Sequence, residues 1–145
     1  MKRLTKGICV LLVCVMVLST VAIAAEPVEP RGSDFFAYSC VYFWRKTGQT
    51  YEIWFDVTTK GIMQEVGARK IIVQRSTDGE NWVTARTILK EDYPHMTTLD
   101  DFQYTNCVTF AATNGYCYRA VVYLYARNST GFGSMRETTT VLDLR

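Results

Sequence analysis

Histidine is almost absent from this chain of 145 residues, where the only one is His95. A serine or cysteine nucleophile needs a basic side chain within hydrogen-bond reach. His95 follows Pro94 in a polar segment, where we expect its imidazole to be solvated. There is no second histidine to complete a zinc site, and the cysteine spacing does not fit one. We therefore expect no catalytic residue, no metal site and no cofactor, in a protein that is not an enzyme.

Paired carboxylates are another route to hydrolysis, because glycoside cleavage needs two of them on opposite sides of a cleft. Glu52 and Asp56 lie on the outward face of an expected strand, whereas residues 91–92 and 100–101 are acids of a polar loop. Both sets are arranged as solvated acids usually are. The loop acids lack the alternating spacing of a calcium-binding loop, so a weak calcium site is only a minor alternative.

The N-terminus has an almost uninterrupted apolar run at residues 7–25, preceded by three basic residues among the first six. Together with the small-residue step Ala22-x-Ala24, this pattern is typical of a secretory signal peptide. We predict a signal peptide at 1–25, a short tether at 26–33, and a mature protein that is secreted. The run is also long enough to span a bilayer, which takes about 20 residues. An uncleaved signal anchor is therefore the alternative.

Removal of the signal peptide changes the charge of the protein. The full chain has 16 Lys and Arg and 14 Asp and Glu, a formal net charge of +2. Without the three basic residues of the signal, 13 cations and 14 acids remain, which gives −1. A near-neutral chain without a run of Lys or Arg offers no electrostatic case for nucleic acid or an anionic membrane. We expect contact with a membrane only through the signal peptide during export.

The mature chain has an odd number of cysteines, namely Cys40, Cys107 and Cys117. An odd count in a secreted protein leaves a free thiol, an intermolecular bridge, or no bridge at all. Cys107 and Cys117 flank one short connection, so closing the loop between them has the smallest entropic cost. The alternatives are a Cys107–Cys117 disulfide, a bridge to Cys40, and no disulfide.

After the tether, apolar and polar residues alternate with period two, which indicates strands rather than amphipathic helices. A turn at 76–81 contains Asp78-Gly79, a pair that supplies the positive φ of tight hairpins. Residues 60–67, 90–101 and 128–134 are expected to be loops. The expected strands are 35–44, 50–59, 69–75, 82–89, 102–112, 116–127 and 136–144. Seven short strands with turns between them predict an all-β, antiparallel two-sheet sandwich over residues 34–145.

Two segments carry a family resemblance. Residues 70–82, KIIVQRSTDGENW, resemble the third strand, turn and following strand of fibronectin type III modules, in which Ser, Asp-Gly and then Trp often follow the strand. Residues 118–134, with Ala126-x-Asn128-x-x-Gly131, resemble the sixth strand of that family and its loop into the seventh. The resemblance implies a fibronectin type III or immunoglobulin-like sandwich and no function. The chain is also similar to short secreted proteins of unknown function from Gram-positive bacteria, which implies nothing about activity.

Placed as in that family, the sixth strand has two distinct faces. One of Tyr116 and Tyr118 is expected to be the corner tyrosine, whose hydroxyl ties a connection to the sheet. We expect Trp82 to be a core residue packed over the hairpin. The core-facing residues of the sixth strand are expected to be Tyr118, Ala120, Val122, Leu124 and Ala126.

The outward residues of the third and sixth strands should share one surface, because these strands are neighbours in such a sandwich. Tyrosine and arginine are enriched in binding hot spots, and an apolar patch rimmed by charge often marks an interaction site. Alternatively, the rings serve sheet packing alone, or the first strand or a partner subunit covers them. The predicted binding face consists of Ile72, Gln74, Arg119, Tyr123, Tyr125 and Arg127, with Lys70 and Val121 beside them.

These observations predict a secreted, non-catalytic binding or adhesion module that recognises a protein or glycan partner. The sequence identifies neither the partner nor the biological role. The alternative is a secreted effector, such as an inhibitor or antimicrobial, that acts by occupying its target. A secreted hydrolase is disfavoured because no base and nucleophile are placed to work together.

Overall fold

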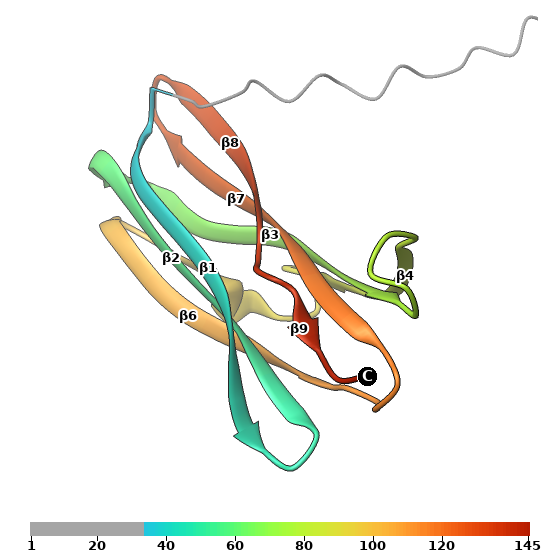
Figure 1. The fold of residues 1–145 in the computed structure, drawn as a ribbon. Helices are drawn as coiled ribbons and strands as arrows, with labels where there is room; N and C mark the ends of the chain where they lie inside the picture. The colour runs from blue at the N-terminus through green and yellow to red at the C-terminus, as the bar shows by residue number, and fades with distance from the viewer. Residues whose placement is uncertain (1–33) are drawn as a thin grey trace, which may run out of the picture.

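Two antiparallel sheets packed face to face are formed by residues 34–145, the part of the chain that the computed structural model describes (Figure 1). The expected signal peptide and tether lie outside these residues. The first sheet has the order β1-β2-β6, with β1 Phe36–Thr47, β2 Thr50–Met63 and β6 Asp101–Ala111. The second has the order β4-β3-β7-β8, with β3 Glu65–Ser76, β4 Val83–Leu89, β7 Cys117–Asn128 and β8 Gly131–Thr138. Two-residue strands, β5 Thr97–Thr98 and β9 Leu142–Asp143, pair with β3 and β7.

This architecture confirms the predicted all-β sandwich of two antiparallel sheets. The seven longer strands divide three and four between the layers, an arrangement compatible with an immunoglobulin or fibronectin type III-like fold. Figure 1 shows β1, β2 and β6 as one layer and β3, β7 and β8 as the other. The central strands β3 and β7 are each paired on both sides.

Two of the predicted loops are largely strand. Residues 60–67 do not form a loop, because β2 continues to Met63 and β3 begins at Glu65, with a register shift between Thr58 and Met63. Residues 128–134 form only a tight turn, since β8 begins at Gly131 opposite Asn128. The predicted last strand 136–144 is divided between β8 and β9. In both predicted loops, glycine that was interpreted from the sequence as a loop residue lies inside or at the start of a strand.

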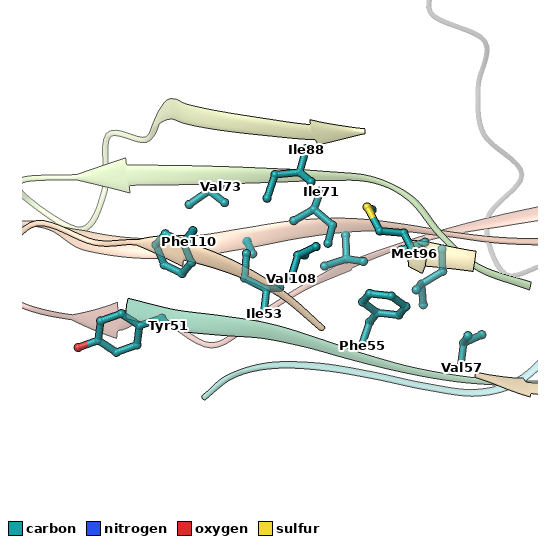
Figure 2. Packing of buried hydrophobic residues seen from close by; sticks show 14 of the residues in the cluster. Tyr51, Ile53, Phe55, Val57, Ile71, Val73, Ile88, Met96, Val108 and Phe110 are labelled. Carbon is teal, nitrogen blue, oxygen red and sulfur yellow. The ribbon is translucent and has the colours of Figure 1, made fainter. Parts of the chain in front are cut away.

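The core is filled by alternate residues of both sheets. Ile53 and Phe55 of β2 point towards Ile71 and Val73 of β3, and all four side chains are fully buried (Figure 2). Burial of each such side chain contributes about 1.5 to 3 kcal/mol relative to exposure. The five core-facing residues predicted for the sixth strand are confirmed, because none of them is more than 3% exposed.

A short 3-10 helix, η1 (Pro94–Met96), closes one part of the sandwich by inserting Met96 into the core (Figure 2). The backbone after Met96 passes directly over Gly67 in β3. Gly67 has a φ of +147°, and a Cβ at this position would overlap the carbonyl oxygen of Met96 and lie 2.7 Å from the Cα of Thr97. Glycine is therefore required here both by conformation and by the close approach of the backbone.

Tyr118 is the corner tyrosine. Its hydroxyl accepts a hydrogen bond from the backbone N–H of Thr113 at 3.0 Å and donates to the Thr113 carbonyl at 3.3 Å. These bonds tie the connection between β6 and β7 back to the second sheet. Tyr116, the other candidate, instead packs the edge of its ring against Tyr118, with 6.4 Å between ring centroids.

We expect Gly67→Ala to destabilise the fold by roughly 2 to 4 kcal/mol, because it adds a backbone overlap to an unfavourable φ. Urea unfolding followed by tryptophan fluorescence measures the loss. Gly61→Ala is the matched control, since a Cβ there meets nothing within 4 Å, and it should change the free energy of unfolding by less than about 0.5 kcal/mol. Equal stability of the two variants would show that η1 does not lie over Gly67.

We expect Tyr118→Phe to lower the free energy of unfolding by about 1 kcal/mol, through loss of the hydrogen bonds to Thr113. Tyr116→Phe removes a hydroxyl from the neighbouring ring and should have almost no effect. The same urea titration compares the two variants. A larger loss for Tyr116→Phe would exchange the roles of the two tyrosines.

Candidate functional site

The pairing of β3 with β7 brings the predicted binding residues onto one surface. Gln74 lies opposite Arg119, Ile72 opposite Val121, and Lys70 opposite Tyr123. Tyr125 and Arg127 continue the same outer face along β7. On the other side of β7, β8 places Arg136 opposite Tyr123 and Phe132 opposite Arg127. We call this surface the basic face, defined by the cations Arg69, Lys70, Arg119, Arg127 and Arg136 and the rings Trp82, Tyr123, Tyr125 and Phe132.

Three cations of the basic face lie over aromatic rings. The Lys70 Nζ is 4.1 Å from the centroid of Tyr123, and the guanidinium carbon of Arg69 is 4.8 Å from that of Tyr125. Arg69 occupies the irregularity in β3 between Ala68 and Lys70. A cation at this distance from a ring is attracted by about 0.5 to 1 kcal/mol at an exposed site. The rings therefore hold the positive charges in fixed positions on the sheet.

Trp82 belongs to this face and not to the core, so its predicted core position was wrong. It is half-buried, with the Arg119 guanidinium carbon 4.4 Å from its ring, while the Arg119 Nε donates to the Gln74 side chain at 2.7 Å. The cause is a register shift: Val73 lies opposite Arg86 but Gln74 lies opposite Thr84. The extra residue reverses the alternation of β4, which turns Trp82 outward.

The apolar residues of the basic face are largely covered. Val121 is only 2% exposed although it lies on the outer side of the sheet, and Ile72 is half-buried. The ring of Tyr125 also packs against Phe132, with 6.1 Å between centroids. Apart from the ring of Phe132, which is 60% exposed on β8, what this face presents to solvent is mainly charge.

Four cations of the basic face have no acidic partner within residues 34–145. Arg127 reaches the Glu65 carboxylate at 3.8 Å, and Lys90 forms a closer ion pair with the same group. Burial alone would raise the pKa of Glu65, but the hydrogen bond and charge of Lys90 outweigh it, so the pKa lies below its usual value. By contrast, among residues 34–145 no carboxylate forms an ion pair with Arg69, Lys70, Arg119 or Arg136.

The outer face of the other sheet is a second surface, which sequence reasoning did not single out. Trp44 and Tyr38 of β1 are 62% and 54% exposed, and Tyr42 lies opposite Trp54 with the two rings parallel within 4°. The Trp54 Nε1 donates to Glu52, which also pairs with Lys46. The signal for it in the sequence was the spacing of Tyr42 and Trp44, two aromatic residues on the same face of one expected strand.

The three cysteines of the described residues are free thiols. Of the three alternatives left open by the sequence, the structure therefore has the one without a disulfide, and neither a Cys107–Cys117 bridge nor a bridge to Cys40 is formed. Cys107 lies on the outer face of the first sheet and Cys117 on the outer face of the second. Packed sheets are about 10 Å apart, beyond the reach of a disulfide. Burial raises the pKa of the Cys107 thiol, with Glu52 adding to it, and burial and a hydrogen bond with Asp143 raise that of Cys117. Protonated thiols are poor nucleophiles.

The other residues considered for chemistry are engaged elsewhere. The exposed His95 ring packs edge-on against Tyr93, and its backbone carbonyl accepts hydrogen bonds from Tyr104 and Asn106. Asp56 accepts a hydrogen bond from Thr105 at 2.9 Å. Within residues 34–145, no group of three or more His, Cys, Asp and Glu side chains is placed to hold a metal ion. In the same range, no helix has the length and apolarity needed to cross a membrane.

Comparison with models of protein families, with curated proteins and with solved structures finds no match to this chain. The fold alone does not specify a function, because β-sandwiches host many unrelated ones. What the protein does must therefore follow from the chemistry of its surfaces.

We expect the Trp82–Arg119 contact to contribute a coupling of about 0.5 to 1 kcal/mol in a double-mutant cycle of Trp82→Ala and Arg119→Ala. Trp82→Ala alone should cost clearly less than the 3 to 5 kcal/mol typical of a buried aromatic residue. Urea unfolding of the four proteins measures both quantities. Strictly additive effects of the two substitutions, or a loss of about 3 to 5 kcal/mol for Trp82→Ala alone, would show that Trp82 is a core residue after all.

Proposed function

We propose that this protein is a secreted, non-catalytic binding or adhesion module that recognises a glycan or protein partner through its basic face. The observation that carries the proposal is that four cations, Arg69, Lys70, Arg119 and Arg136, lie on one face of the sheet with no acidic partner among residues 34–145. The signal-peptide pattern of residues 1–25 supports secretion.

The fold does not require these charges where they are. Like charges on neighbouring positions repel one another and weaken the folded state. Arg69 and Lys70 are adjacent in β3, and Arg136 lies across Tyr123 from Lys70. A ligand of opposite charge removes this repulsion, and cations already fixed over rings lose less conformational entropy when they bind it. The arrangement is therefore better suited to binding than to folding.

The absence of catalysis is supported by the state of the reactive groups that are described. The Cys107 and Cys117 thiols have raised pKa values, and the carboxylates of Glu52 and Asp56 are held by neighbouring side chains. The His95 imidazole lies against Tyr93 at the surface. The carboxylates and the imidazole are therefore engaged with neighbouring side chains, and the thiols are held in their neutral form. These states support a binding role and not catalysis.

We assign the sandwich to the fibronectin type III kind as part of this proposal. The strand order β1-β2-β6 and β4-β3-β7-β8 supports the assignment, as does the corner tyrosine Tyr118. In this arrangement β3 and β7 are the third and sixth principal strands. Their outer side is an extended and rigid surface suited to presenting a fixed pattern of side chains.

We expect the double variant Tyr123→Ser with Tyr125→Ser to fold but to lose its partner. Removal of the rings takes away the supports of Lys70 and Arg69, so affinity should fall at least tenfold, which corresponds to about 1.4 kcal/mol. The immobilised secreted protein is used to capture ligands from the surface extract and medium of the producing cells, and affinity is then measured by calorimetry.

The matched control is Tyr42→Ser with Trp44→Ser, which removes two exposed rings from the opposite sheet. This control should retain capture, and thermal unfolding should show that both variants remain folded. Loss of capture in the control alone would place recognition on the β1-β2-β6 sheet. Normal capture by both variants would assign it to the loops.

A further inference from the structure

We infer that the ligand of the basic face is a carboxylated polysaccharide, a chain built from uronic acids. This inference rests on the proposed function and specifies its ligand. The exposed guanidinium groups of Arg69 and Arg136 offer planar pairs of donors, which match the two oxygens of a carboxylate, and Arg119, whose Nε is bonded to Gln74, keeps its terminal nitrogens for the same purpose. None of them is occupied by an acid among the described residues.

The cations are spread along the face rather than gathered at one point. Lys70, Tyr123 and Arg136 form one row across β3, β7 and β8, in which Tyr123 separates the two cations. Since neighbouring strands are about 4.8 Å apart, the backbones at Lys70 and Arg136 are about 10 Å apart. From Arg119 to Arg127 the face extends about 27 Å at about 3.4 Å per residue. Such spacing fits an extended polymer with at most one charge on each sugar.

Nucleic acid fits this surface less well. Duplex DNA carries one charge per about 1.7 Å, or about 16 charges over the same length, against five cations on the face. Single strands bind by stacking bases on open aromatic rings. The rings of Tyr123 and Tyr125 are instead covered by Lys70 and Arg69. The mature chain is also slightly acidic as a whole, at −1.

A protein partner also fits less well. Protein interfaces have a dry centre of apolar and aromatic groups. Here Val121 is buried and the tyrosine rings lie under cations, while the exposed ring of Phe132 lies on the edge strand β8 and not at the centre of the face. Both β3 and β7 are paired on each side, so a peptide cannot join the sheet at this surface. What remains accessible is the charged end of Arg69, Arg127 and Arg136 and the ring of Phe132, with the exposed Thr87 and Thr138 beside them.

Polygalacturonate, which has a carboxylate on every sugar, is the probe, and neutral dextran is its control. The secreted protein should bind polygalacturonate and not dextran, with an affinity that falls as salt is raised, because salt screens exposed charges. The triple variant Arg69→Gln, Lys70→Gln and Arg136→Gln should bind at least tenfold more weakly. A second triple variant, Arg45→Gln, Lys46→Gln and Lys60→Gln, removes the same charge from the opposite sheet and should bind within twofold of the wild type.

Several results would overturn the inference. Equal weakening by the two triple variants would show attraction to overall charge and not to this face. Tighter binding of dextran sulfate, of single-stranded DNA or of polyglutamate would assign the face to a sulfated polymer, to nucleic acid or to an acidic protein. The protein could also fail to bind polygalacturonate while the Tyr123→Ser/Tyr125→Ser variant still loses its captured partner. That result would show that the ligand is not a uronic-acid polymer, and the proposed function would stand.

Discussion

The pairing of β3 with β7 is the constraint on which the rest of the structure depends. It runs from Glu65 opposite Arg127 to Ser76 opposite Cys117, through the middle of the larger sheet. Because side chains alternate, this one register buries Ile71 and Val122 and turns Lys70 and Tyr123 outward. A slip by one residue would exchange the two sets, placing cations in the core and core residues in water. The same backbone hydrogen bonds therefore specify both the core and the candidate binding surface.

Local alternation explains which features could be predicted from the sequence. The two-sheet class and the core-facing side of β7 follow from period-two patterns that each strand carries within itself. The position of Trp82 could not be predicted, because the extra residue in the β3–β4 pairing reverses alternation through a relation between two strands. Gly67 was interpreted as a loop residue for a similar reason. Glycine is required at this position by the backbone of Met96, which is distant in the sequence. Errors occurred where a contact between segments overrides a local rule.

The charge of the surface is likewise a product of topology. Residues 26–145 are nearly neutral and contain no run of cations, which gave no electrostatic case from the sequence for nucleic acid or an anionic membrane as partner. The fold nonetheless collects Arg69 and Lys70 from β3, Arg119 from β7 and Arg136 from β8 on one side. Acids such as Glu52 and Asp56 lie on the opposite sheet. A molecule with little net charge can thus have a strong local field, which is what orients a charged ligand during approach.

The contacts between cations and rings on the basic face have two effects: they cover apolar surface and they fix the positions of the charges. Left open, Tyr123 and Tyr125 beside Ile72 would form an exposed apolar patch of the kind that promotes association. Left unsupported, Lys70 and Arg69 would be mobile charges, each losing conformational entropy of up to about 2 kcal/mol when fixed by a ligand. Placing each cation within 5 Å of a ring covers the apolar surface and fixes the charge together. Trp44 and Tyr38 on the other sheet remain open to solvent, as Phe132 does at the edge of the larger sheet. The centre of the basic face, where cations cover the rings, is therefore suited to different chemistry from the β1-β2-β6 face.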